Sequence, residues 1–311
     1  MTATNPTSGH HSPPDASGPA PAGGRSGDQG DTGTPGNARP TGIGRTDGGT
    51  GIDGPGRGTG GRRRAGLREA VAFEVAKLRA TRSLIGTVVA AGVVLPVFAV
   101  IVALTDSLQP DDTILGASLT AAVFAQLLAG VFGALTLTGE YAQGTIRTTF
   151  LAQPRRRVVV TAKALVVAVA LTGMGLVASG AAFLIGWAML DRDAHPTGDP
   201  WPALAGVALT LAATGLLGLA VGAVVRRSAG AVAAVVGVLL VPSLVAPLAG
   251  DFQRWVAGAA PAAALEKLTQ TSDATADTVG ALGGWPSLLV VAAYTAGLLA
   301  VATRALQRRD A

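Results

Sequence analysis

The stretch Thr138–Lys163, TGEYAQGTIRTTFLAQPRRRVVVTAK, is a polar and basic insert between two long apolar runs. No other segment between hydrophobic runs of this chain is as charged. The runs on either side are long enough to cross a bilayer, for which a helix needs about 20 apolar residues. The sequence therefore predicts a membrane protein in which this insert connects two spans.

The composition of the 311-residue chain indicates an integral membrane protein in contact with the lipid bilayer. Its hydrophobic fraction is 49% and its charged fraction only 14%, whereas about a quarter of the residues in soluble domains are charged. The net charge of +5 comes from basic residues that flank the apolar runs, which indicates membrane topology and no nucleic-acid partner. The chain has no cysteine, which excludes thiol chemistry, and it has only three histidines. We therefore expect no metal and no cofactor.

Residues 1–64 are expected to form a disordered tail. The segment is rich in glycine and proline, and its first 60 residues contain no Leu, Val, Phe, Tyr or Trp. Such a composition cannot bury enough apolar surface to offset the entropy lost on ordering. A partner-binding arm and a tolerated extension are both compatible with it, and the lack of any motif favours the extension.

Residues 65–83 predict an amphipathic helix that lies in the membrane interface. The apolar residues that share one face are Leu67, Val71, Val75 and Leu78. Basic residues, among them Lys77, Arg79 and Arg82, lie along the edges of this face. Glu74 falls inside the apolar arc, which is costly unless a cation is close. Two interpretations remain open: a buried pair with a basic residue of the insert, or a side chain that reaches the head groups.

Six apolar segments follow this helix, at about residues 84–104, 114–137, 164–190, 203–225, 229–248 and 286–301. The last is short for a bilayer of about 30 Å, so we expect it to extend by a turn at each end. Arg226 and Arg227 separate the fourth segment from the fifth, because arginine is costly at the centre of a bilayer. The predicted fold class is an all-α integral membrane protein with six transmembrane helices, an N-terminal interfacial amphipathic helix and a disordered N-terminal tail.

The connecting segments predict the orientation of the chain. The segments on one side, which include the insert and both ends of the chain, carry 17 basic residues, and those on the other side carry three. The positive-inside rule therefore places both termini and the insert in the cytoplasm of a multi-pass plasma-membrane protein.

The polar and small residues of the spans predict how the helices pack. None of the six segments has an ionisable residue in its interior, which counts against an ion-coupled carrier. We expect Thr120, Gln126 and Thr136 to form interhelical hydrogen bonds rather than to line a translocation path. Gly218 and Gly222 have the GxxxG spacing that lets helix backbones approach closely.

The external connection 249–285 predicts two short helices, either interfacial or re-entrant. Asp251 is a candidate N-cap of the first helix, and Pro261 suits the first turn of the second.

No phosphate-binding loop occurs in this chain, since none of its three lysines follows the required glycine pattern. If nucleotide energy drives the protein, another polypeptide must hydrolyse the nucleotide. The insert is then the natural place for that polypeptide to dock.

Residues Glu140–Arg155, EYAQGTIRTTFLAQPR, followed by Ala162-Lys163, resemble the signature E-Y-x-x-G-T-I-R-x-T-L-x-x-x-P-R with a downstream A-K of type-2 ABC exporter permeases. Phe150 departs mildly from that pattern, since it replaces the usual leucine. Glu74–Ser83, EVAKLRATRS, resembles the E-x-x-K-L-R-x-x-R-S helix that leads into the same family's membrane domain. The resemblance covers about residues 65–311 and carries no information on the substrate.

This resemblance implies a non-enzymatic permease subunit of an ABC exporter. Such a subunit pairs with a second permease copy or paralogue and with cytosolic ABC ATPase subunits, and its insert forms a coupling helix on the ATPase. The residues expected to couple to the ATPase are Glu140, Gly144, Thr145, Ile146, Arg147, Leu151 and Pro154. The sparsely polar interior suits an amphiphilic or drug-like substrate. The alternative is a non-transporting membrane scaffold or sensor subunit.

Local chemistry agrees with a short helix inside the insert. Gly144 frees the backbone after the second span, and Thr145 is able to cap a helix over residues 146–151. Pro154 cannot continue that helix, so the chain turns there. For the arginines at 155–157 we favour a topological role at lipid head groups over direct contact with an ATPase.

Overall fold

The computed structural model describes residues 62–105, 107–108, 110–145, 156–248, 250–272, 274–275 and 279–308. Internal contacts divide the chain into Met1–Gly56 and Arg57–Ala311, and the description below concerns the second unit. Of the predicted tail, residues 1–61 lie outside the described residues, so its disorder stays a prediction.

The described residues form helices and connections, with no strand. In chain order the helices are α1 (Arg62–Ala80), α2 (Arg82–Thr105), α3 (Ile114–Leu119), α4 (Ala122–Ala142), α6 (Arg156–Met189), α7 (Pro200–Val225), α8 (Ser228–Val245), η1 (Ala246–Leu248), η2 (Gly250–Phe252), α9 (Gln253–Gly258), α10 (Pro261–Thr269) and α12 (Gly284–Arg308). Six helical stretches are long and apolar enough to cross a membrane, and they cover residues 82–105, 114–142, 157–189, 200–225, 228–248 and 284–307. The predicted all-α fold with six spans is therefore confirmed.

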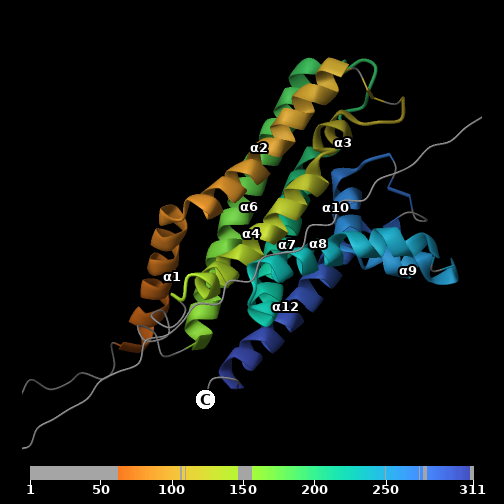
Figure 1. Ribbon diagram of the computed structural model, residues 1–311. Helices are drawn as coiled ribbons and strands as arrows, with labels where there is room; N and C mark the ends of the chain where they lie inside the picture. The colour runs from red at the N-terminus through yellow and green to blue at the C-terminus, as the bar shows by residue number, and fades with distance from the viewer. Residues whose placement is uncertain are drawn as a thin grey trace, which may run out of the picture. The chain divides into compact units, whose positions relative to one another are not determined.

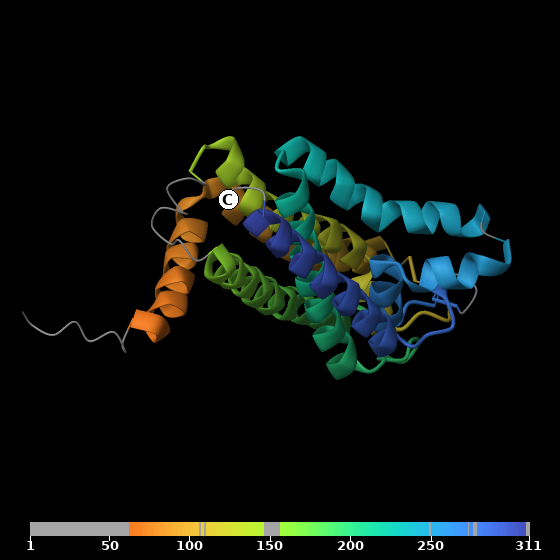
Figure 2. The ribbon, with the colours of Figure 1, turned by 90° about the horizontal axis from the view of Figure 1, so that it is seen from below.

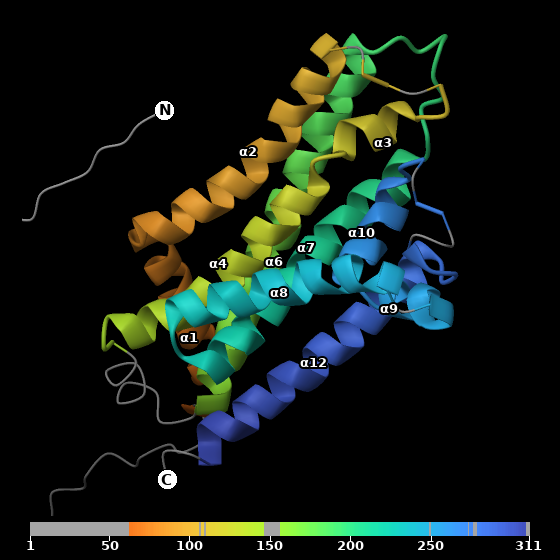
Figure 3. The same ribbon diagram turned by 45° about the vertical axis from the view of Figure 1, so that its right-hand side comes forward.

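The six spans alternate in direction, so the bundle has two distinct ends (Figure 1). One end holds α1, the end of α4, the start of α6, the turn from α7 to α8 and the last turn of α12, and we call it the α1 end. The opposite end holds α3, α9 and α10, and we call it the α10 end; Figure 3 shows these three helices together.

α1 and α2 meet at a sharp corner at Thr81. The Thr81 hydroxyl and amide both donate to the carbonyl of Lys77, at 2.9 and 3.1 Å, which closes the last turn of α1. The boundary between the two helices therefore lies at Thr81, two residues before the predicted one. Seen from below, α1 extends to one side of the bundle (Figure 2). Its place in a membrane interface stays a prediction.

The second predicted span is not one continuous helix. It breaks between α3 and α4, where the Thr120 hydroxyl donates to the carbonyl of Ala117 at 2.9 Å. Thr113 caps the start of α3, since its hydroxyl accepts a hydrogen bond of 2.9 Å from the Gly116 amide. The expectation that Thr120 bonds between helices is therefore wrong, because its hydrogen serves the backbone of its own turn.

The same prediction of interhelical hydrogen bonds was made for Gln126 and Thr136, the other two polar residues of this span, and it holds for only one of them. Thr136 donates to the carbonyl of Phe132 within α4, at 2.7 Å, so it does not bond between helices as expected. Gln126 does: its amide group donates to the Thr214 hydroxyl on α7 at 3.2 Å and to the Pro261 carbonyl at 2.9 Å.

α7 lies at the centre of the bundle, and its glycines allow α4 to approach closely. A Cβ atom on Gly218 would overlap the carbonyl oxygen of Gly130, and one on Gly222 would lie 2.8 Å from the carbonyl oxygen of Ala134. The close approach predicted from the GxxxG spacing is therefore present.

The α10 end is built from short helices that are joined by hydrogen bonds. Pro261 begins α10 as expected, and α10 is largely buried, which favours the re-entrant interpretation for this helix. Asp251 lies within η2 and not at the N-cap of α9, which is Phe252, so that prediction was wrong. Gln270, in the left-handed region at φ 55°, exchanges hydrogen bonds of 3.2 and 3.1 Å with the backbone of Asp199.

Candidate functional site

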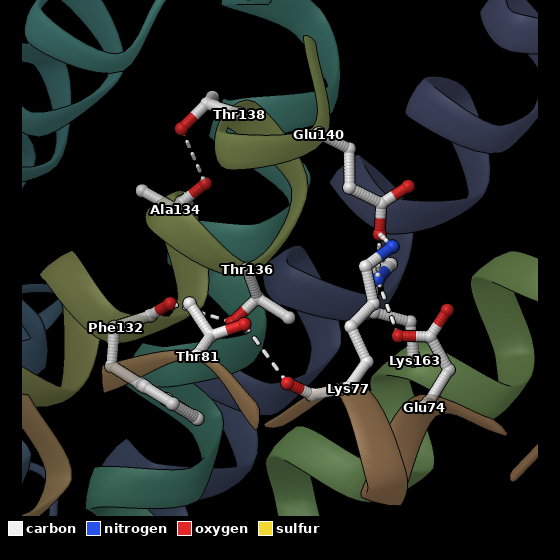
Figure 4. Close-up of polar contacts among 9 residues, drawn as sticks. All are labelled: Glu74, Lys77, Thr81, Phe132, Ala134, Thr136, Thr138, Glu140 and Lys163. Atoms are coloured by element: carbon white, nitrogen blue, oxygen red, sulfur yellow. Dashed lines mark hydrogen bonds and ion pairs between the residues drawn. The ribbon is translucent and has the colours of Figure 1, made fainter. Parts of the chain in front are cut away.

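Four charged side chains from three helices meet at the α1 end (Figure 4). The Lys163 ammonium donates to Glu74 Oε2 and to Glu140 Oε1, each at 2.6 Å. Lys77 Nζ lies 2.7 Å from the same Glu140 Oε1. Two carboxylates and two ammonium groups balance in charge, and we call these four residues the ion cluster.

The ion cluster is almost fully removed from solvent. The exposed fraction of the side chain is 1% for Lys163, 2% for Glu140 and 5% for Glu74, against 26% for Lys77. Buried charges are stable only when they are paired in good geometry, and a buried charge that loses its partner costs several kcal/mol. Lys163 is therefore the centre of the cluster, since it is the single cation in contact with both carboxylates.

The sequence places these residues together through helix geometry. Glu74 and Lys77 are three residues apart, so they share one face of α1. Glu140 lies in the last turn of α4, and Lys163 lies two turns into α6. Glu140 and Lys163 therefore lie near the two ends of the polar insert, and we call these two positions the feet of the insert. α1 packs against both through Glu74 and Lys77.

The structure decides between the two interpretations of Glu74. Its side chain is buried and pairs with Lys163, the last residue of the insert. The buried pair with a basic residue of the insert is therefore present, and the side chain does not reach the head groups. Arg79 and Arg82 are exposed and lie outside the ion cluster.

Ionisable groups are thus part of two candidate spans. The apolar segments as bounded from the sequence contain none, but α4 and α6 continue beyond those segments and include Glu140 and Lys163. Both residues were assigned to the connecting loop because they are charged. The sequence did not show that each has a partner of opposite charge, which lets it lie within a helix of the bundle. Lys163 was therefore missed as a site residue, and its position in the downstream Ala-Lys of the motif was the available signal.

The described part of the insert begins with a turn at Gly144. Gly144 has φ +68°, in the left-handed region that glycine enters most readily, and its amide donates to the carbonyl of Tyr141 at 3.3 Å. The predicted role of Gly144 in releasing the chain from the second span is in keeping with this geometry. Thr145 ends the described part of the turn. The predicted coupling helix and four of its expected residues lie outside the described residues: Ile146, Arg147, Leu151 and Pro154.

Two further contacts connect the remaining helix ends to this region. The Arg226 guanidinium, at the left-handed C-cap of α7, lies 5.6 Å from the centre of the Tyr141 ring at the end of α4. Arg157 in the first turn of α6 donates to Gln307 in the last turn of α12, at 3.2 Å. Neither contact was predicted from the sequence. Together they bring the α7–α8 turn and the end of α12 to the feet of the insert.

A cavity of about 170 Å³ lies next to the ion cluster, between α1, the start of α2, α4 and α6. Leu78, Leu84, Leu135 and Val166 form much of its apolar wall, and Glu140 is among its polar residues. Within the described ranges, no group of three or more acidic or histidine side chains could hold a metal ion. The chemistry of this region is therefore ionic attachment of helices beside an apolar cavity.

Comparison with known families gives one result that covers most of the chain. Residues 69–311 match the family model described as ABC-2 family transporter protein. A comparison with curated proteins gave no match. The matched region includes all four residues of the ion cluster, both feet of the insert and all six candidate spans.

Proposed function

The chain belongs to the ABC-2 transporter family, and we propose that it is the permease subunit of an ABC exporter. ATP hydrolysis by a separate ATPase subunit drives the export. As a member of this family, it is a multi-pass membrane component of an ABC transporter. The separate ATPase subunit, the outward direction and the pairing with a second permease copy or paralogue belong to the proposal.

The orientation proposed is the one predicted by the positive-inside rule, with the α1 end in the cytoplasm of a plasma-membrane protein. Its support is that α1, the feet of the insert, the α7–α8 turn and the end of α12 lie at one end of the bundle (Figures 1 and 3). The basic segments of the sequence are the ones that connect there.

The observation that carries the proposed coupling is the position of the ion cluster at the two feet of the insert. A force on residues 143–155 acts on Glu140 of α4 and on the α6 segment that bears Lys163. Because Lys163 holds both Glu140 and Glu74 at 2.6 Å, α1 is joined to both feet. We propose that an ATPase which presses on the insert moves the ends of α1, α4 and α6 as one unit.

The substrate proposed is an amphiphilic or drug-like molecule. It rests on the largely uncharged interior of the spans away from the ion cluster, where the buried polar groups are hydroxyls and the amide of Gln126. A charged substrate would need paired charges at depth.

The docking proposal is tested by co-purification with an ABC ATPase expressed together with the chain. Replacement of residues 146–151 by a Gly-Ser sequence of the same length should abolish co-purification, because the coupling helix is removed. A Gly-Ser replacement of residues 190–195, at the α10 end, is the matched control and should leave the complex intact. Survival of the complex after the first replacement would contradict docking at the insert.

A further inference from the structure

We infer that η2 and α9, which follow the fifth candidate span, anchor the chain in the interfacial layer of the lipid bilayer. α9 lies at the periphery of the bundle (Figures 1 and 3). The partner that this surface fits is the bilayer itself, where the lipid head groups meet the acyl chains. The inference rests on the membrane class of the chain and not on the docking of an ATPase.

Three large apolar side chains, which we call the anchor patch, are exposed where the chain leaves the fifth span. The exposed fraction is 83% for Leu248, 70% for Phe252 and 65% for Trp255. Leu248 is the last residue of the span, and Gly250, at φ 54°, turns the chain towards α9. Phe252 and Trp255 are three residues apart at the start of α9, so they share one face.

α9 has its small residues on the protein side and its large apolar residues on the outside. Ala257 and Gly258 are buried. A Cβ atom on Gly258 would lie 3.5 Å from the Cα atom of Gly280, so the backbone itself packs against the protein. A helix that faces water has the opposite arrangement, with its large apolar side chains towards the protein. The surroundings of the anchor patch are therefore apolar.

The other three tryptophans of the chain mark the same boundary on three other helices. Trp187, Trp201 and Trp285 each lie within two residues of an end of a candidate span, and all three are exposed. These span ends belong to the α10 end, so all four tryptophans are found there. Tryptophan is enriched where a membrane meets water. A bilayer interface surrounds the bundle and contacts all four helices, whereas a second copy of the chain would cover one side.

Arg254 restricts the depth of the anchor. It is exposed on α9, between Phe252 and Trp255 in the sequence. An arginine in the hydrocarbon core is costly, and a position in water would leave the anchor patch uncovered. In the interfacial layer the guanidinium reaches the lipid phosphates while the apolar side chains stay among the lipids.

The test uses the full chain with Trp255 as its single tryptophan, after Trp187→Phe, Trp201→Phe and Trp285→Phe, in phosphatidylcholine nanodiscs. Phosphatidylcholine brominated near the top of its acyl chains quenches a tryptophan in the bilayer, and iodide quenches one in water. Trp255 should lose most of its fluorescence to the brominated lipid and little to iodide. Ala194→Trp in a chain without the other tryptophans is the aqueous reference, because Ala194 is exposed in the connection before α7.

Two results would overturn the anchor. Quenching by iodide without quenching by the brominated lipid would show that α9 lies in water. Quenching by neither would show that protein covers Trp255, as a second copy of the chain would.

A matched pair of double variants tests whether the anchor patch acts as one surface. In the chain with Trp255 alone, Leu248→Ser with Phe252→Ser removes the two neighbours of Trp255 and should increase its quenching by iodide. Leu104→Ser with Phe73→Ser removes the same side chains from exposed positions on α2 and α1 and should leave it unchanged. An equal change in the two double variants, or no change in either, would contradict a shared anchor.

Discussion

Lys163 at the α1 end is wholly buried and Lys267 at the α10 end is partly buried, and the two lysines have different kinds of partner. Lys163 contacts two carboxylates at 2.6 Å. Lys267 donates to the hydroxyl of Ser287 at 3.0 Å, and burial lowers its pKa against an opposing effect of Glu266. Lys163 is therefore held by paired charges, whereas Lys267 donates to an uncharged hydroxyl group.

This difference has a physical consequence for how each end responds to change. A single hydrogen bond of a partly exposed group contributes about 1 kcal/mol, so the loss of one has a small effect. A buried ion cluster loses far more when one member is removed, because the remaining charges stay buried without partners. The α1 end should therefore respond in an all-or-none manner, which suits an attachment that must transmit force, and the α10 end should change gradually.

The largest expected effect is that of removing the central cation. Lys163→Met leaves Glu74 and Glu140 buried without their shared partner, and should lower the free energy of unfolding by about 3–5 kcal/mol. Chemical unfolding in detergent measures it, with Lys267→Met as the matched control, expected to cost no more than about 1.5 kcal/mol. Equal losses in the two variants would remove the distinction between the two ends.

Close packing of α4 on α7 gives the next effect. Gly218→Leu places a side chain where the backbone of Gly130 lies, and overpacking of this kind costs about 1–3 kcal/mol. Gly173→Leu is the control, because its Cβ position is open, and it should be close to neutral. The same unfolding measurement compares them, and an unchanged stability of Gly218→Leu would contradict the observed approach of the two helices.

The hydrogen bonds of Gln126 give a smaller effect. Gln126→Leu removes the donor to Thr214 and to the carbonyl of Pro261, and interhelical hydrogen bonds in membranes contribute about 0.6–1.7 kcal/mol. A double-mutant cycle with Thr214→Val measures the coupling between the two side chains. A coupling energy of zero would show that the pair does not hold α4 to α7.

The smallest effect concerns pH. Because burial lowers the pKa of Lys267 in the folded chain below its usual 10.5, the unfolded chain binds the proton more tightly, and stability should rise as pH increases towards 10.5. The rise should be absent in Lys267→Met. Unfolding measured at several alkaline pH values tests it, and a fall in stability that depends on Lys267 would contradict the sign.

The number of spans could be predicted from the sequence, and the partners of the charges could not. Run length and flanking charge reflect the cost of placing polar groups in lipid, which is a local property of the chain. The pairing of Glu74 with Lys163 joins residues far apart in sequence, so only the suspicion that Glu74 needs a cation was available in advance. The same limit applies to the cavity, which has walls from four helices.

The break at Thr120 shows a second limit of the sequence. Residues on both sides of it are apolar and include no proline, so the run reads as one helix. The threonine hydroxyl competes for the backbone carbonyl of Ala117, and the short α3 packs against α6 through the close contact of Ser118 with Gly186. Tertiary packing therefore decides the position of the break.

The central claim is that the ends of α1, α4 and α6 move as one unit when an ATPase acts on the insert. The chain has no cysteine, so spin labels can be placed at exposed positions, with Arg79→Cys on α1, Ala142→Cys on α4 and Ala229→Cys on α8. Pulsed electron–electron double resonance on the complex with its ATPase measures the distances between the labels. The α1–α4 distance should be the same with and without a non-hydrolysable ATP analogue, while the α1–α8 distance should change. An α1–α4 distance that shifts with nucleotide as much as the α1–α8 distance would contradict the account.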